Sequence, residues 1–71
     1  MGGSVYKVIE IIGTSDVSWE EAARSAVEEA ASHLEDLRVA EVEKLDLHIV
    51  DNKVIAYRAK VSVSFKYHKD A

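Results

Sequence analysis

The sequence predicts an α+β fold with the element order β-α-β-β, in which a three-stranded antiparallel sheet wraps around one helix. Three observations lead to this prediction. An apolar run with strand character opens the chain, an alanine-rich stretch with helical spacing follows it, and two long alternating runs flank the pair Asp51-Asn52. With 71 residues, the chain has room for one domain, residues 1–71.

The first strand is predicted over residues 5–12. Both of its alternating sets of side chains are largely apolar, which is typical of a strand that is covered on both faces. Gly13 begins a group of turn-forming residues that extends to Asp16, and this group is expected to end the strand.

The helix is predicted over residues 19–35. Ser18 and Glu21 match a capping box, in which the Ser18 hydroxyl accepts from the Glu21 backbone N–H and the Glu21 carboxylate reaches back to the Ser18 N–H. The packed face is mostly alanine, and small side chains let a helix approach a sheet closely. This face comprises Ala22, Ala23, Ala26, Val27, Ala30, Ala31 and Leu34.

Two further strands are predicted over residues 37–50 and 53–67, joined by a two-residue hairpin turn. Asp51 and Asn52 both tolerate the positive φ that such a turn requires. The compact arrangement places the third strand between the other two, so that every pairing is antiparallel.

A regular hairpin around this turn places Val42 opposite Val61 and Glu43 opposite Lys60. In this register, the two halves of the hairpin carry their apolar side chains on opposite faces. One face collects Ala40, Val42, Ala59, Val61 and Val63, and the other face collects Leu45, Leu47, Ile49, Val54 and Ala56. A single helix covers only one of these patches, so a second subunit is expected to cover the other.

Composition restricts both the stabilisation of the fold and its partners. The chain has no cysteine, so neither a disulfide nor a thiolate metal site supplements its small core, and self-association or a bound ion is the expected stabiliser. The net charge of −4 argues against a nucleic-acid partner, because phosphate binding relies on clustered Lys and Arg. No apolar run approaches the ~20 residues of a membrane span, and the cytoplasm is the expected location.

Asp46 and His48 lie two residues apart on a predicted strand, so they share one face. A carboxylate and an imidazole suit a divalent metal ion, although symmetry-related copies would have to complete such a site. A solvated strand face explains the same pair without any ligand. Arg58 is a candidate for binding a phosphate or carboxylate at a subunit junction, with a cross-strand ion pair as the alternative.

The chain shows no spacing that is typical of an enzyme. It contains neither a nucleophile elbow nor a glycine-rich phosphate loop. The paired acids Glu20-Glu21 and Glu28-Glu29 are explained as solvated helix faces. We therefore expect no catalytic activity.

Four segments, in this order, resemble the dodecin family. They are VYKVIEIIGTS at residues 5–15, SWEEAARSAVEEA at residues 18–30, RVAEV at residues 38–42 and YRAKVSVSFK at residues 57–66. The resemblance covers nearly the whole chain. It implies the β-α-β-β fold and, in addition, a hollow homododecamer of cubic (23) symmetry.

Dodecins bind flavins such as riboflavin or FMN in pairs, and the resemblance assigns two positions of this chain to that site. Val39 corresponds to the family's stacking Trp, and Arg58 corresponds to its hydrogen-bonding Gln. Valine has no ring to stack and arginine offers only donors, so the usual flavin pocket is expected to be altered. The sequence is most similar to a branch without the stacking Trp, some of whose members are associated with calcium.

These expectations combine into a non-enzymatic dodecameric shell that binds or stores a small ligand or ion at subunit interfaces. Three alternatives stay open. They are flavin storage as in ordinary dodecins, calcium binding, with Asp46 and His48 as the candidate metal ligands, and an assembly module with a vestigial site.

Overall fold

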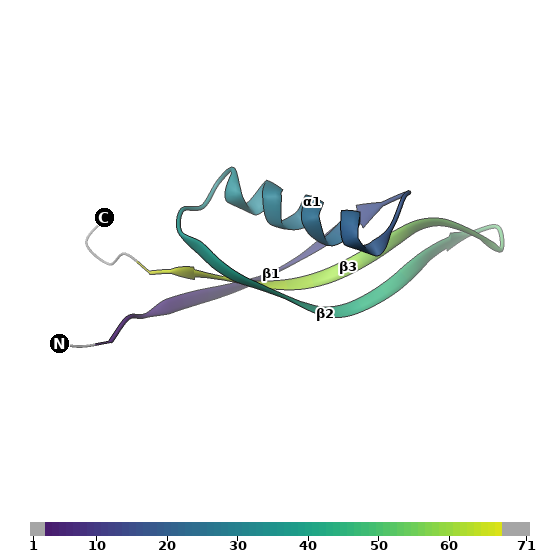
Figure 1. Ribbon diagram of the computed structural model, residues 1–71. Coiled ribbons are helices and arrows are strands. Elements are labelled where there is room, and N and C mark those ends of the chain that lie inside the picture. Colours follow the sequence, from purple (N-terminus) through teal and green to yellow (C-terminus); the bar gives the residue numbers. More distant parts are fainter. Residues whose placement is uncertain (1–2, 68–71) are drawn as a thin grey trace.

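The computed structural model describes residues 3–67, which form a curved antiparallel sheet with one helix lying across it (Figure 1). The elements are β1 (Tyr6–Ser15), α1 (Trp19–Ala31), β2 (Leu37–Val50) and β3 (Lys53–Lys66). The strand order is β1-β3-β2, so the prediction that the third strand lies in the centre is confirmed. The molecule is elongated, with extents of 55 × 20 × 15 Å, because the β2–β3 hairpin continues beyond the helix.

β1 is longer than predicted, because the expected turn residues remain in the strand. The strand pairs with β3 as far as Ser15, which lies opposite Tyr57. Gly13 is buried beneath the helix, and its missing side chain lets the strand pass close under α1. The Ser15 hydroxyl then accepts from the Val17 backbone N–H at 2.9 Å, so the chain turns only after the end of β1.

The start of α1 confirms one half of the predicted capping box. Ser18 Oγ accepts from the Glu21 backbone N–H at 3.1 Å. The return contact is not formed: the Ser18 backbone N–H donates to Ser15 Oγ at 3.4 Å, and the Glu21 carboxylate lies 4.0 Å from the Arg24 guanidinium. The cap therefore joins the helix to the end of β1.

α1 ends at Ala31, before the predicted end at residue 35. The chain has to reverse direction between α1 and β2. Asp36, with a φ of 61°, has the left-handed backbone conformation at this turn. At 13 residues, α1 spans only about 20 Å, whereas the 14-residue strands span about 46 Å. Within residues 3–67, no helix has both the length and the apolar character to cross a membrane.

The hairpin turn is confirmed, but its register differs from the prediction. Asp51 and Asn52 have φ values of 53° and 63°, as a tight two-residue hairpin turn requires. Val42 lies opposite Val61, but Lys60 lies opposite Lys44, so the predicted pairing of Lys60 with Glu43 is wrong. Glu43 is an extra residue at a register shift, and this β-bulge changes the phase of the strand.

This bulge corrects the predicted distribution of apolar side chains. Leu45 lies opposite Ala59, which is fully buried on the helix-facing side of the sheet, and Leu47 lies opposite Tyr57. Leu45 and Leu47 therefore share a face with Val42 rather than lying on the opposite face. A second register shift lies between His48 and Ile49. Because of it, Ala56 pairs with His48 on the face away from the helix and does not share a face with Leu45 and Leu47.

The buried core is small. Its members are Ala22, Ala26, Ala30, Ala59, Val61 and Val63. Within the described residues, valine is the largest fully buried side chain. The helix packs mainly on β1 and β3, so β2 is exposed along its whole length after Leu37. A large apolar surface is therefore left uncovered in the single chain.

Candidate functional site

Four residues lie where the hairpin leaves the helix, and we call them the elbow cluster: Trp19 and Tyr57 on the helix-facing side of the sheet, and Asp46 and Arg58 on the other side. Trp19 Nε1, at the start of α1, donates to the backbone oxygen of Asp46 at 3.0 Å. The Trp19 and Tyr57 rings pack edge to face, with centroids 5.2 Å apart and planes at 74°. The cluster thus joins the helix to both strands of the hairpin.

The strongest polar contact in the cluster is a two-pronged ion pair. Asp46 and Arg58 are cross-strand partners, and Arg58 Nε and Nη2 donate to the two Asp46 carboxylate oxygens at 2.7 and 2.9 Å. These hydrogen bonds, together with the guanidinium charge, hold the pKa of Asp46 below its ordinary value. The same contact raises the pKa of Arg58. Arg58 thus forms a cross-strand ion pair within its own chain, which is the alternative to its predicted role in binding an anion at a subunit junction.

This ion pair predicts that the fold is slightly less stable at acid pH. Asp46→Asn should remove this pH dependence. Because the pKa of Asp46 is lowered on folding, the pair stabilises the fold above the ordinary carboxyl pKa, near ~3.9, and loses that effect as the pH falls through the lowered value. Urea unfolding midpoints at neutral pH should be lower for the variant, and the gap to the unmodified chain should close on acidification below pH ~4. The turn variant Asp51→Asn is the control, and a gap that is independent of pH would contradict the assignment.

The candidate metal ligands Asp46 and His48 share a strand face, as predicted, but they do not form a site within one chain. Arg58 already occupies both oxygens of the Asp46 carboxylate, and His48 lies opposite Ala56, which offers no ligand. Among residues 3–67, no three His, Cys, Asp or Glu side chains come close enough together to hold a metal ion. A cation site would need ligands from further copies of the chain.

The two positions that the family resemblance assigned to flavin are far apart in one chain. Val39 lies opposite Ser64 on β3, and Arg58 is six residues away from Ser64 along the same strand. At about 3.3 Å per residue, this separates them by about 20 Å. A site that uses both positions around one ring would therefore have to combine different copies. Val39 itself is 62% exposed.

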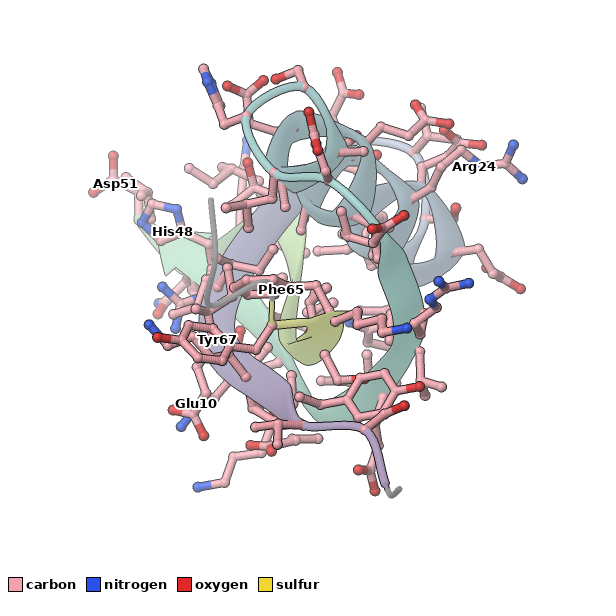
Figure 2. The ribbon with its side chains drawn as sticks, turned by 90° about the vertical axis from the view of Figure 1, so that its left-hand side faces the viewer. Glu10, Arg24, His48, Asp51, Phe65 and Tyr67 are labelled. Carbon is pink, nitrogen blue, oxygen red and sulfur yellow. The ribbon has the colours of Figure 1, made fainter. Side chains whose placement is uncertain are left out.

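The face of the sheet away from the helix has a second ion pair and a side-chain hydrogen bond. Lys60 Nζ lies 3.4 Å from the carboxylate of Glu10 on β1, and Ser62 donates a hydrogen bond to Glu43. In the view along the sheet, Glu10 lies on the side away from the helix, whereas Arg24 projects from the helix (Figure 2). The sequence pattern missed the pairing of Lys60 with Glu10, because that pairing depends on the neighbouring strand β1.

Trp19 and Tyr57 are the members of the elbow cluster that sequence analysis did not place there. The Trp19 indole contacts a residue 27 positions away, and no local spacing indicates such a contact. The Asp46–Arg58 pair was detectable in principle, because the change of apolar phase at Glu43–Lys44 is the signal of a bulge. Moving the register by one residue at that point brings Arg58 opposite Asp46.

Comparison with known proteins gives consistent matches. The dodecin family model matches residues 5–68. Calcium dodecin from Mycobacterium tuberculosis is 52% identical over 63 residues, which cover 89% of this chain and 89% of that protein. A crystal structure of calcium dodecin from the same organism, described as a calcium-chelating antigen with a novel calcium-binding site, superposes with a TM-score of 0.84 and 48% identity over 96% of this chain and 97% of that one. Dodecin from Streptomyces coelicolor superposes with a TM-score of 0.88 and 29% identity over 97% and 99% of the two chains.

Proposed function

Because this chain belongs to the dodecin family, we propose that it assembles into a non-enzymatic dodecameric shell that binds calcium at the interfaces between its copies. The observation that carries the proposal is the 52% identity to a protein named calcium dodecin, which extends over 89% of both chains. At that level of identity, a shared ligand is the simplest expectation. Calcium prefers carboxylate and carbonyl oxygens, which an acidic chain supplies readily.

The exposed apolar surface supports assembly. The described residues leave 15 large hydrophobic side chains exposed, while the fully buried ones are no larger than valine. Below about 70–80 residues, one core rarely stabilises a domain by more than about 3–5 kcal/mol, and this core is poor even for its size. Because the chain has no disulfide, burial between copies and a bound ion are the sources of stabilisation that remain.

Residues 3–67 of one chain form no complete metal site, which fits binding at interfaces. Six to eight oxygen ligands surround a typical calcium ion, and the described residues bring no three candidate side chains together. Carboxylates from neighbouring copies are therefore required. His48 and Asp46 stay candidates only if the copies reposition them, because Arg58 occupies the Asp46 carboxylate.

Flavin storage is the less supported reading of the same family. Val39 offers no ring for stacking, and Arg58 is paired with Asp46. The chain thus lacks both of the side chains that the family resemblance assigns to the flavin. Yellow colour in the purified protein, or quenching of riboflavin fluorescence on addition of the protein, would favour flavin storage over calcium binding.

A native mass spectrum tests the assembly. We expect a species near ~95 kDa, twelve times the 7.9 kDa chain. Mass in excess of the twelve chains then identifies what is bound: multiples of a calcium ion support the proposal, and multiples of a flavin support flavin storage. A 7.9 kDa species alone would overturn the shell.

Calcium should raise the thermal unfolding midpoint of the assembled protein. A ligand that binds only the folded state stabilises it by about 2.7 kcal/mol at a hundred times its dissociation constant. We expect the midpoint to rise with added calcium and to fall after chelation, with magnesium at equal concentration as the control for charge screening. A midpoint that responds equally to both ions, or to neither, would leave the shell as an assembly module without a calcium site.

A further inference from the structure

Two register shifts in the β2–β3 hairpin offset each other. At the first shift, Glu43 is an extra residue on β2. At the second shift, Ile55 is an extra residue on β3, between the partners of His48 and Ile49. One extra residue on each strand adds up to no net change, so the pairing next to the two shifts on either side follows a regular two-residue hairpin. Only residues 44–48, which we call the shifted segment, are displaced.

The same two strands also fit together without either extra residue. We call the observed pairing the bulged register. If the shifted segment moves by one position along β3, Glu43 comes opposite Lys60 and both irregularities disappear, which gives the bulge-free register. The turn and the β1–β3 pairing stay as they are. Because a slip of one residue turns every side chain of a strand to the other face, Asp46 would leave the face that Arg58 occupies.

Burial within one chain does not choose between these registers. β2 lies at one edge of the sheet, so only its pairing with β3 changes (Figure 1). All five residues of the shifted segment are exposed, and its two large apolar side chains, Leu45 and Leu47, are 51% and 40% exposed. The buried side chains of β3 keep their places in both registers. A register is specified strongly where one face of a strand is buried, and weakly where neither face is.

Charged side chains favour opposite choices. In the bulged register Lys44 lies opposite Lys60, and like charges that lie directly opposite each other destabilise a strand pair. The bulge-free register replaces this pairing by Glu43 opposite Lys60, which are opposite charges. The Asp46–Arg58 ion pair favours the bulged register, because its hydrogen bonds at 2.7 and 2.9 Å require both side chains on one face.

Trp19 contacts the same residue of the shifted segment from the other side of the sheet. Its Nε1 donates to the backbone oxygen of Asp46 at 3.0 Å. A slip of one residue moves a strand by about 3.3 Å along its partner, which is more than a hydrogen bond tolerates. This contact therefore also belongs to the bulged register. We infer that the shifted segment has two registers, and that Arg58, together with Trp19, holds it in the bulged one.

The two registers differ in what they do with the candidate metal ligands. In the bulged register Arg58 occupies both carboxylate oxygens of Asp46. In the bulge-free register Asp46 and His48 turn together to the helix-facing side of the sheet, and the carboxylate is released from Arg58. Arg58 is thus a positioning residue that acts on Asp46 through the pairing of the strands. This inference goes beyond the proposed function, because it requires neither a bound ion nor a second copy.

Disulfide trapping within one chain reports the register, because the chain has no cysteine of its own. In the bulged register His48 lies opposite Ala56, so His48→Cys with Ala56→Cys forms a disulfide. Leu47→Cys with Ala56→Cys forms one only in the bulge-free register, because in the bulged register these two side chains point to opposite faces. The full chain is oxidised under native conditions, and mass spectrometry after thiol alkylation gives the rate at which each pair closes.

Arg58→Met keeps the length of the side chain and removes every donor. We expect it to speed closure of the Leu47→Cys/Ala56→Cys pair at least ~10-fold and to slow the His48→Cys/Ala56→Cys pair, because loss of a two-pronged charged contact shifts a two-register population by about that factor. Arg38→Met is the matched control, since Arg38 lies on β2 outside the shifted segment, and it should leave both rates unchanged.

Lys60→Glu should reverse the effect of Arg58→Met. It places opposite charges across from each other in the bulged register, where Lys44 is the partner, and like charges in the bulge-free register, where Glu43 is the partner. A general loosening of the hairpin would not respond to the sign of this charge. Equal closure rates with and without Arg58→Met, an equal rise in the Arg38→Met control, or no reversal by Lys60→Glu would each overturn the inference.

If the cysteine pairs prevent folding, a crystal structure of the Arg58→Met chain decides. Glu43 opposite Lys60 is the expected pairing, and Lys44 opposite Lys60 would contradict the inference. If Arg58→Met itself does not fold, Asp46→Asn replaces it, because this substitution weakens the same ion pair from the other strand. Both readouts lie within one chain, so they remain decisive even if the shell or its calcium site fails its own test.

Discussion

Gly13→Ala should abolish stable folding. We expect no other addition of a single methyl group to this chain to be as damaging. A Cβ at this position would lie 2.0 Å from the backbone oxygen of Ala22 and 2.9 Å from the Cβ of Ala26. Contacts this short force the helix away from the sheet. Overpacking costs about 1–3 kcal/mol in ordinary cores and more where the structure cannot move. We expect a loss of at least ~3 kcal/mol, a large part of the 5–15 kcal/mol that stabilises typical domains.

Circular dichroism and urea unfolding measure this effect, and the chain offers a close control. Gly3→Ala adds the same methyl group where nothing lies within 4 Å, so its unfolding midpoint should be unchanged. The double variant Gly13→Ala/Ala26→Gly should also fail, because it relieves the contact with the Ala26 side chain but not the contact with the Ala22 backbone. Recovery in the double variant would show that the helix can retreat from β1.

The sensitivity of Gly13 follows from the alanine stripe that the sequence revealed. Ala22 and Ala26 let α1 lie so close to the sheet that only glycine fits beneath it. The backbone at Gly13 does not have a positive φ, so close approach alone explains the residue. The close approach also leaves little space for large side chains, and this is why no fully buried side chain among residues 3–67 is larger than valine.

Local patterns predicted the elements well, because each depends on neighbouring residues. The Ser18 cap, the alanine face of the helix and the positive φ values at Asp51 and Asn52 all involve contacts within a few positions. The ends of the elements were less predictable. Gly13 remained in β1 because a helix lies above it, and that helix is not visible in the local pattern of the strand.

The register of the hairpin could not be predicted from a regular turn. The bulge at Glu43 and the shift between His48 and Ile49 move the pairing of residues 44–48 by one position, while residues 39–42 and 49–50 keep the predicted register. A third shift lies between Leu37 and Val39. The first two shifts misplaced Lys60 and hid the Asp46–Arg58 pair. The candidate residues were thus named correctly, but the partner of each depended on a bulge that tertiary packing determines.

Leu45→Asp should disassemble the protein. In the single chain, Leu45 is 51% exposed and lines an open groove of about 500 Å³ with Trp19, Ala23 and Val42. A charge at a position this exposed costs little in a monomer, where surface substitutions usually change stability by less than about 0.5 kcal/mol. If a second copy covers the groove, the same carboxylate is buried without a partner, and the cost rises to several kcal/mol.

The native mass spectrum distinguishes these cases, with Lys44→Asp as the control that places the same charge on the neighbouring residue. We expect Leu45→Asp to lose the ~95 kDa species at micromolar concentration, while Lys44→Asp retains it. An unchanged mass for Leu45→Asp would mean that the helix-facing side of β2 faces solvent in the assembly.

Whether the released Leu45→Asp monomers stay folded tests whether the single chain is stable without assembly. In the part of the chain that the structure describes, valine is the largest fully buried side chain, and this is too little apolar burial to offset the entropy of ordering the residues. The Leu45→Asp monomers should therefore lose their circular dichroism signal as well as their mass. Folded monomers would show that the alanine-lined contact between α1 and the sheet suffices, and assembly would then serve the ligand site rather than the stability of the chain.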